Sequence, residues 1–384
     1  MKALLLTNLF PSPQEPTRGV FNRNWFSALS KYCEVRVVSP IPWWSRWKTP
    51  GALLTAPSAE FDGISCCYPA YWSVPRLAAM HSEGMYRSLK PLLRRMRREY
   101  PFDMIISAWA YPDGVAGAQF ACDFHCPHVL KVLGSDINEI ALHPALRRKI
   151  VSACETSSKI IAVSSALGDK IEQMGVPKEK IVRQHNAVDG ERFRIQNRED
   201  LRKRLQLPLD RRIVFYAGNF KPEKGTDILA EAWGEFQKTD NGRTLLVLVG
   251  GGSLEPKLHA RAKELGMEDS ILFAGRRPHA EIPDWMGACD VFCLPSLREG
   301  CPNVILEALA CGRPVVASRV GGVPELLNDE NGIMVEPNNP SALSEALENA
   351  LHKEWSPQQL RTTVECLSWD VIGRRMYGLL EEVV

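Results

Sequence analysis

Residues 295 to 314 read PSLREGCPNVILEALACGRP and decide the fold of the region around them. The apolar runs Val291 to Leu294 before them and Pro314 to Ser318 at their end are typical of buried strands. Pro302 suits the first turn of a helix, where its missing N–H costs nothing, and Gly312 suits the position just past a helix end. The stretch therefore predicts a strand, a loop, a helix from Pro302 to Cys311, and a second strand.

The same alternation of short apolar runs and longer segments with helical periodicity extends over the whole chain, and it predicts parallel strands covered by helices. The first series of runs comprises Ala3 to Leu6, Val35 to Ser39, Met104 to Ser107, Val129 to Leu133 and Ile160 to Val163. The second series comprises Ile213 to Ala217, Thr244 to Val249, Ile271 to Ala274, Val291 to Leu294, Pro314 to Ser318 and Ile333 to Val335. We expect an α/β protein with two Rossmann-like, doubly wound parallel sheets.

The length of 384 residues exceeds what one hydrophobic core usually supports, so two domains are expected. The first series ends near Asn186 to Asp189 and the polar stretch Gln196 to Pro208 opens the second, which places the hinge at residues 186–196. We predict an N-terminal domain over residues 1–190 and a C-terminal domain over 191–366. Residues 367–384 are expected to form an amphipathic helix that packs back on the first domain.

Charge is distributed unevenly although the formal net charge is only +2. Residues 1–190 carry 23 Lys and Arg against 16 Asp and Glu, and the remainder carries 24 against 29. A basic first half suits an anionic partner such as a lipid headgroup or a diphosphate, or it is an ordinary solvated face. Nucleic acid is not expected, since no recognised nucleic-acid-binding fold surrounds the basic residues.

The eleven cysteines lack paired ligand spacing and indicate reduced, packed thiols. One local cluster, Cys122, His125, Cys126 and His128, has no second half-site at zinc-ligand spacing, so we expect no metal there. Met1 to Leu6 is too short an apolar run for a signal peptide and is expected to be a strand. The reduced thiols indicate a cytoplasmic protein, and because no stretch is long enough to span a bilayer, any membrane contact is expected to be peripheral.

The expected helix after Glu299 can bind an anion, because ligands of parallel sheets lie beyond the strand carboxyl ends and a helix N-terminus there offers amides and positive potential. A diphosphate would lie at Asn303 and Val304. Glu299 could then accept hydrogen bonds from sugar hydroxyls, and Glu307 from the two hydroxyls of a ribose. Alternatively, both glutamates are surface charges near a helix start, although the apolar neighbours of Glu307 indicate a buried carboxylate that needs partners.

This stretch closely resembles the family-four, group 1 retaining glycosyltransferases of the two-Rossmann GT-B architecture. The resemblance extends over nearly the whole chain. It includes GNFKPEKG at 218–225, GGG at 250–252, GRRP at 275–278, GGVPE at 321–325, GVP at 175–177 and NAVD at 186–189. A GT-B protein would have its two domains facing each other across a cleft.

The resemblance implies roles by position. Lys224 matches the lysine that contacts the donor diphosphate, Glu299 the carboxylate facing the donor sugar, and Glu307 the ribose ligand. Where members usually have an arginine, this chain has Asn219, and Lys221 or Arg18 could supply the charge. The full predicted donor site comprises Gly19, Asn219, Lys224, Gly250, Arg276, Arg277, Glu299, Gly300, Cys301, Pro302, Asn303, Val304 and Glu307.

The catalytic residues implied are Glu299, Lys224 and Asp136. Many members carry a histidine where this chain has Leu133, which makes Asp136 the best polar candidate of the first domain, or else the N-cap of the following helix. Aromatic residues of the first domain could stack on an acceptor sugar, or they pack in the core. The predicted acceptor site comprises Trp43, Trp44, Trp109, Tyr111 and Asp113.

The segment Arg87 to Arg98 interleaves basic with apolar residues and could dock on anionic lipid. A solvated helix face is the alternative, and Pro91 is expected to shorten the regular helix.

The resemblance implies transfer of a hexosyl group from a nucleotide diphosphate sugar, with UDP favoured over GDP, to a saccharide or polyprenyl-diphosphate-linked acceptor in bacterial polysaccharide or cell-envelope biosynthesis. No convincing Asp-x-Asp loop occurs, so we expect a metal-independent reaction without cofactor. Two alternatives remain. A sugar-nucleotide 2-epimerase shares the architecture, and a non-catalytic protein could bind a nucleotide sugar or polyanion.

Overall fold

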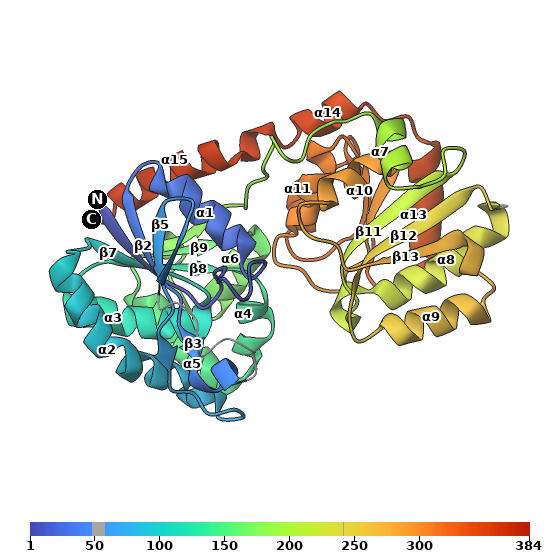
Figure 1. Cartoon of the computed structure of the whole chain (residues 1–384). Helices are drawn as coiled ribbons and strands as arrows, with labels where there is room; N and C mark the ends of the chain where they lie inside the picture. The colour runs from blue at the N-terminus through green and yellow to red at the C-terminus, as the bar shows by residue number, and fades with distance from the viewer. Residues whose placement is uncertain (48–57, 241) are drawn as a thin grey trace. The chain divides into compact units, whose positions relative to one another are not determined.

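The computed structural model describes residues 1–47, 58–240 and 242–384, and the chain forms two compact units (Figure 1). The first unit comprises Met1–Asn186 together with Trp369–Val384, and the second comprises Ala187–Ser368. The chain therefore leaves the first unit near the expected hinge and re-enters it at the last helix.

The first unit contains an eight-stranded sheet in the order β10-β9-β8-β7-β1-β2-β5-β4, in which only β4 pairs antiparallel. The strands are β1 (Lys2–Leu6), β2 (Glu34–Val38), β4 (Ser58–Phe61), β5 (Ile64–Cys67), β7 (Met104–Ala108), β8 (His128–Val132), β9 (Lys159–Ala162) and β10 (Ile181–Arg183). The main helices are α1 (Val20–Ser30), α2 (His81–Glu99), α3 (Val115–Phe124), α4 (Ser135–Asn138), α5 (Pro144–Thr156) and α6 (Ser165–Gln173). Central strands such as β7 are buried throughout, as expected when helices cover both faces.

Each apolar run predicted in the first half is found as a strand, but several short strands were missed. β4 and β10 are the two edge strands of the sheet, β5 lies between β2 and β4, and β3 (Ile41–Pro42) pairs with β6 (Ala70–Tyr71) in a separate two-stranded sheet. These elements are short and only partly buried, so they lack the continuous apolar signal on which the prediction relied.

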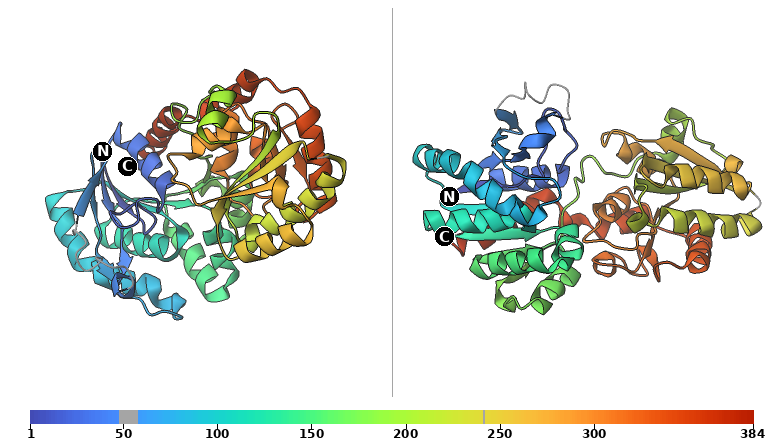
Figure 2. Two further views of the ribbon diagram at one scale, coloured as in Figure 1. Left: turned by 45° about the vertical axis from the view of Figure 1, so that its right-hand side comes forward. Right: turned by 90° about the horizontal axis from the view of Figure 1, so that it is seen from below.

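The last helix, α15 (Trp369–Glu381), belongs to the first unit and packs along α1, as Figures 1 and 2 show. Lys31 Nζ lies 2.5 Å from Asp370 Oδ1, and the rings of Tyr32 and Tyr377 stack with centroids 5.8 Å apart. A Cβ on Gly373 would lie 2.7 Å from the Ala28 carbonyl oxygen, so glycine permits the close approach of the two helices. The chain end therefore closes the first unit rather than extending the second.

The second unit contains a six-stranded parallel sheet in the order β13-β12-β11-β14-β15-β16, which is the Rossmann order 3-2-1-4-5-6. The strands are β11 (Arg212–Asn219), β12 (Thr244–Gly251), β13 (Ile271–Gly275), β14 (Val291–Leu294), β15 (Val315–Ser318) and β16 (Gly332–Val335). The helices are α7 (Arg198–Arg204), α8 (Thr226–Asp240), α9 (Glu255–Glu264), α10 (Ile282–Ala288), α11 (Asn303–Ala310), α12 (Val323–Leu326), α13 (Pro340–His352) and α14 (Pro357–Thr362). The two predicted parallel sheets are thus confirmed.

Helices α8, α9 and α13 share one face of this sheet, and α10 and α11 lie on the other (Figure 1). Trp233 of α8 is completely buried in the core, and its indole N–H donates to Ser270 Oγ at 3.0 Å. Burying a large apolar side chain of this kind stabilises the fold by about 3 kcal/mol, provided that its polar atom finds a partner.

Helix α11 is one residue shorter at each end than expected. Pro302 has extended backbone angles and is the N-cap, and Cys311 is the C-cap. At the start of the helix, Pro302 therefore caps α11 and does not form part of its first turn, which begins at Asn303. Gly312 follows with φ of 69°, and the turn is closed by bonds from the Gly312 amide to Leu309 O and from the Arg313 amide to Ala308 O.

Helix α2 runs without interruption through Pro91, so the expected shortening is wrong. Pro91 is exposed, while Leu89 and Leu93 on the opposite side are completely buried in the core, which holds the helix in place. Of its basic residues, Arg87 pairs with Glu83 at 2.5 Å and Lys90 with Asp123 at 2.8 Å. Arg95 also lies 3.8 Å from Glu99, so several of these basic residues are paired, and membrane docking stays a prediction. Within the described residues, no helix is both long and apolar enough to cross a bilayer.

Candidate functional site

Lys224 and Glu299 form an ion pair in the loops that follow two neighbouring strands of the second unit. Lys224 lies in the turn after β11, and Glu299 lies between β14 and α11. Lys224 Nζ donates to Glu299 Oε1 at 2.7 Å, and Ser296 Oγ donates to the same oxygen at 2.7 Å. The Glu299 side chain is only 9% exposed, whereas that of Lys224 is 30% exposed. The fold thus brings together two of the three predicted catalytic residues.

Close backbone approaches hold the Glu299 loop against the Lys224 loop and against the loop after β15. Gly225 has φ of 62°, and a Cβ there would lie 2.0 Å from the Pro295 carbonyl oxygen. Gly321 has φ of 53°, and a Cβ there would lie 2.2 Å from the Glu299 carbonyl oxygen. The Gly322 amide also donates to Gly300 O at 2.9 Å. Glycines are required here because the Glu299 loop touches the Lys224 loop and the loop after β15 through backbone atoms.

Helix α11 begins four residues after Glu299. Cys301 and Pro302 are buried, whereas Asn303 and Val304 in the first turn are half-buried. The first amides of any α-helix lack intrahelical acceptors and carry partial positive charge. Lys224 and the start of α11 therefore supply positive potential at one edge of the sheet.

Glu307, in the second turn of α11, is 13% exposed, and its Oε1 lies 3.5 Å from His279 Nε2. The His279 ring in turn lies edge-on to Phe193, with ring centroids 5.9 Å apart. The sequence argument that Glu307 sits among apolar neighbours and needs a partner is therefore met by a histidine that it did not anticipate.

Arg276 and Arg277 follow β13 at the same edge of the sheet. Arg276 Nη2 donates to Gly251 O at 3.2 Å, and Arg277 Nε donates to Ala274 O at 3.0 Å. Gly250, at the end of β12, has φ of 148°, and a Cβ there would lie 1.8 Å from the Gly218 carbonyl oxygen. These hydrogen bonds fix the course of the loop that follows β13 and hold it against the end of β12.

Asn219, which occupies the position of the family's usual arginine, is exposed at the end of β11, where its carbonyl accepts from Tyr216 Oη at 3.0 Å. Lys221, offered as a substitute charge, is also exposed and lies 3.8 Å from Glu223. Arg18, the other substitute, pairs with Glu15 at 2.8 Å in the first unit.

In the first unit, Gly19 has φ of 60° and precedes α1 as its N-cap. A Cβ there would lie 2.2 Å from the Leu9 carbonyl oxygen, so the loop after β1 folds tightly back on the helix start. Asp113 lies close by, completely buried, and its Oδ2 accepts from the Asn8 amide at 2.7 Å. Burial raises the pKa of Asp113 to about 8, although the Asn8 amide and the charge of Arg18 oppose the shift.

Asp136 is completely buried and ties two loops together through backbone amides. Its oxygens accept from Leu133 at 3.1 Å, Gly134 at 2.8 Å, Ile137 at 3.1 Å and Ala110 at 3.1 Å. Burial raises its pKa and these amides lower it. Its alternative assignment as an N-cap is wrong, because Gly134 holds that position. Its catalytic role stays a prediction, and the geometry gives it a loop-organising one.

The predicted acceptor aromatics occupy different environments. Trp43 is 44% exposed, and its indole donates to Ser73 O at 3.0 Å, while the Trp44 indole donates to Ser73 Oγ at 3.0 Å. Trp109 has φ of 143°, a strained conformation that is rare for a non-glycine residue and concentrates at ligand sites. Tyr111 is buried, and its hydroxyl donates to Ala78 O, which is the packing role left open by the sequence.

His128 of the Cys122 to His128 cluster is buried between two hydroxyls, with Nδ1 2.8 Å from Ser157 Oγ and Nε2 3.0 Å from Ser107 Oγ. Burial lowers the pKa of His128 to about 3. Over the described ranges, no three His, Cys, Asp or Glu side chains gather where they could hold a metal ion. All eleven cysteines are free thiols, and most of them are buried.

Sequence comparison covers both units. Residues 24–192 match the family described as Glycosyltransferase Family 4, and residues 197–365 match Glycosyl transferases group 1. TuaC of Bacillus subtilis (strain 168), which carries a provisional name as a teichuronic acid biosynthesis glycosyltransferase, is 30% identical over 374 residues, or 93% of this chain and 91% of TuaC. The chain belongs to the group 1, family 4 glycosyltransferases. The predicted family is thus confirmed.

Solved structures support the same architecture. Sucrose-phosphate synthase from Thermosynechococcus elongatus is 20% identical with a TM-score of 0.81, covering 99% of this chain and 98% of that one. HepE of Anabaena, solved in complex with UDP, is 20% identical with a TM-score of 0.78 over the whole of both chains. The GT-B fold class of this glycosyltransferase is therefore confirmed.

Ser296 and His279 are the site residues that sequence reasoning missed. Ser296 is completely buried three residues before Glu299, and His279 follows Arg277 by two residues. Their only sequence signal is a polar side chain just past a strand end. That signal does not say which carboxylate each residue contacts.

Proposed function

We propose that this glycosyltransferase transfers a hexosyl group, with retention of configuration, from a UDP-sugar to a saccharide or polyprenyl-diphosphate-linked acceptor in cell-envelope polysaccharide biosynthesis. The observation that carries the proposal is the Lys224–Glu299 pair, 2.7 Å apart, in the loops beside the start of α11. The UDP complex of HepE supports the carrier, and the name of TuaC supports the class of polymer.

In this proposal the donor diphosphate lies against Lys224 and the first turn of α11. The leaving diphosphate oxygen gains negative charge as the bond to the anomeric carbon breaks. A fixed ammonium and helix amides stabilise that charge without reorganising during the step. Glu299 would then exchange its bond with Lys224 for bonds from sugar hydroxyls, while Ser296 keeps the carboxylate oriented.

Retention requires the acceptor hydroxyl to approach on the face from which the diphosphate leaves. The acceptor oxygen bonds to the anomeric carbon, and its proton passes to an oxygen of the departing diphosphate. Glu307 would accept from the ribose hydroxyls, with His279 as its neighbour. Lys224 and α11 provide the positive charge that a metal ion provides in other sugar transferases, so we propose that the reaction is metal-independent and needs no cofactor.

A panel of UDP- and GDP-sugars, tested for protection against thermal unfolding, checks the donor assignment. A ligand at about 100 times its Kd stabilises the native state by about 2.7 kcal/mol. A UDP-sugar should raise the unfolding temperature, and GDP-sugars should do so less. Equal protection by both carriers, or by neither, would contradict the UDP assignment.

The variant Glu307→Ala sharpens the test. Loss of a hydrogen-bonding carboxylate should weaken UDP binding about tenfold or more by calorimetry. Glu231→Ala is the matched control, since Glu231 lies on α8 and pairs with Arg261 at 2.7 Å. Equal affinities for both variants would show that the ribose lies elsewhere.

Two further measurements test the reaction itself. Turnover that persists in the presence of a chelator supports a metal-independent step. Conversion of the UDP-sugar to an epimer without acceptor would favour the 2-epimerase alternative.

A further inference from the structure

A polar cavity lies at the amino ends of the strands in the second unit. Asp290 immediately precedes β14, and Arg313 lies two residues before β15. Since the strands are parallel, these residues lie at the sheet edge opposite to the one that carries Lys224 and Glu299. The cavity has a volume of about 420 Å³, and Arg198, Arg313 and Trp355 contribute to its lining.

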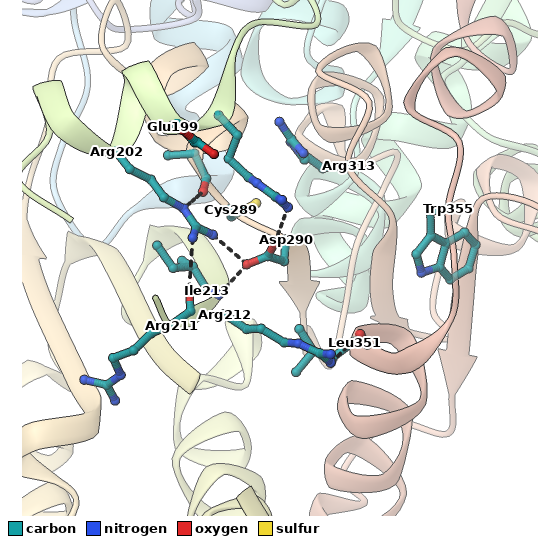
Figure 3. A network of polar contacts seen from close by, with 12 residues as sticks. Glu199, Arg202, Arg211, Arg212, Ile213, Cys289, Asp290, Arg313, Leu351 and Trp355 are labelled. Atoms are coloured by element: carbon teal, nitrogen blue, oxygen red, sulfur yellow. Dashed lines mark hydrogen bonds and ion pairs between the residues drawn. The ribbon is translucent and has the colours of Figure 1, made fainter. Parts of the chain in front are cut away.

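Positive charge exceeds negative charge around this cavity. Asp290 Oδ2 accepts from Arg202 Nη2 and from the Ile213 amide, both at 2.6 Å (Figure 3). Its Oδ1 accepts from Arg198. The single carboxylate of Asp290 therefore faces two guanidinium groups, those of Arg202 and Arg198, and Arg313 adds a third positive charge. Asp290 makes its hydrogen bonds with Arg202, Arg198 and the Ile213 amide, and within the described residues it acts on Arg313 through its charge and not through a hydrogen bond.

Arg313 is buried without a full set of acceptors. The residue is 7% exposed, and its Nη2 donates to Gly287 O at 2.6 Å. Its Nε is buried and has no hydrogen-bond partner among the residues that the structure describes. A buried guanidinium is costly unless its charge and its N–H groups are matched, and burial accordingly lowers the pKa of Arg313. An anion in the cavity that Arg313 lines would balance this buried charge.

The wall formed by Trp355 limits what can enter. Its indole donates to Ala350 O at 2.8 Å, and Lys353 Nζ lies 4.0 Å from the ring centroid. Lys353 itself is exposed and adds a further positive charge to the cavity lining. The volume suits a small ligand, and arginine forks suit the paired oxygens of a phosphate group.

We propose that this cavity binds the phosphate group of a small soluble phosphorylated compound, held by Arg198 and Arg313 beside Trp355. The site is separate from the proposed donor site, and the two lie near opposite ends of α11. It is formed by segments far apart in the sequence: α7, the turn after α11 and the connection from α13 to α14.

Calorimetric titration with inorganic phosphate, at constant ionic strength against chloride, tests the proposal. Phosphate should bind the parent protein and raise its unfolding temperature, whereas chloride should do neither. Arg198→Gln should weaken phosphate binding about tenfold or more. Arg204→Gln is the matched control, because Arg204 lies on the same helix, pairs with Asp284 at 2.6 Å and does not line the cavity. Equal affinities for these two variants would overturn the proposal.

Further variants separate this site from other sources of phosphate binding. Lys224→Ala should retain the phosphate effect, and its loss there would assign the effect to the donor site and overturn the proposal. Arg313→Gln should abolish phosphate binding if this variant folds. If it does not fold, Arg198→Gln still tests the site, because the Arg198 side chain is half-exposed and its replacement should leave the fold intact. Sedimentation with phosphatidic acid vesicles that depends on Arg198, without any response to inorganic phosphate, would replace the soluble ligand by a lipid headgroup and overturn the proposal as stated.

Discussion

Carboxylates that follow parallel strands are held differently in the two units. Asp136 in the first unit is completely buried and accepts four backbone amides, whereas Glu299 in the second keeps some exposure and is held by the side chains of Lys224 and Ser296. Backbone amides cannot turn away from a carboxylate without disrupting the loop, but a lysine side chain can. The first arrangement therefore organises the loops, and the second can exchange a protein partner for a ligand.

The largest expected effect, on the transfer rate, comes from removing Lys224, the partner that Glu299 can exchange for a ligand. Lys224→Ala should lower the transfer rate by about 10² to 10³, because a preorganised positive group no longer faces the leaving diphosphate. Steady-state turnover measures this. Lys238→Ala is the matched control, since Lys238 is an exposed lysine in the last turn of α8, at the opposite end of that helix from Lys224. Similar rates for the two variants would show that Lys224 does not act on the leaving diphosphate.

The contact between the loops of the second unit can be tested by stability. Gly225 and Gly266 have nearly the same φ, 62° and 63°, but only a Cβ on Gly225 would meet the backbone, at Pro295. Gly266→Ala should lower the free energy of unfolding by about 1 to 2 kcal/mol through the left-handed conformation alone. Gly225→Ala should cost clearly more, measured by urea unfolding. Equal losses would show that the loops can separate freely.

The loop-organising role of Asp136 predicts a stability effect that Glu307 should not share. Asp136→Asn replaces one acceptor oxygen with an NH₂ group that faces amide donors, so the free energy of unfolding should fall by about 2 kcal/mol. Glu307→Gln should change it by less than about 1 kcal/mol, because Glu307 is still in contact with solvent. A larger loss for Glu307→Gln would reverse the comparison.

A further effect concerns the pH dependence of the first unit. The pKa of Asp113 is raised to about 8, so the folded protein keeps a proton between about pH 4 and 8 that the unfolded chain has lost. Stability from this group is present at low pH and is lost as pH rises through that range, by at most about 1.4 kcal/mol per pH unit. Asp113→Asn should flatten this decline in urea unfolding measured from pH 5 to 8. An unchanged slope would show that Asp113 is ionised in the folded state.

Local sequence patterns were enough for the central architecture. Each predicted apolar run became a strand, since a buried parallel strand must be apolar throughout, and Pro302 and Gly312 located α11 to within a residue. The short strands β3 to β6 and β10 had no such signal. Pro91 was misjudged because the buried Leu89 and Leu93 hold α2 in place through tertiary packing.

The sequence by itself determined the two parallel sheets, the family and the kinds of side chain at the strand ends. Only the tertiary structure decided their partners: Lys224 meets Glu299 across 75 positions of sequence, Asp136 joins two loops, and Arg313 is buried beside Asp290. The physical reason is that strand and helix periodicity is a local property of the chain. Which polar groups satisfy each other depends on loops that meet only after the sheet has formed.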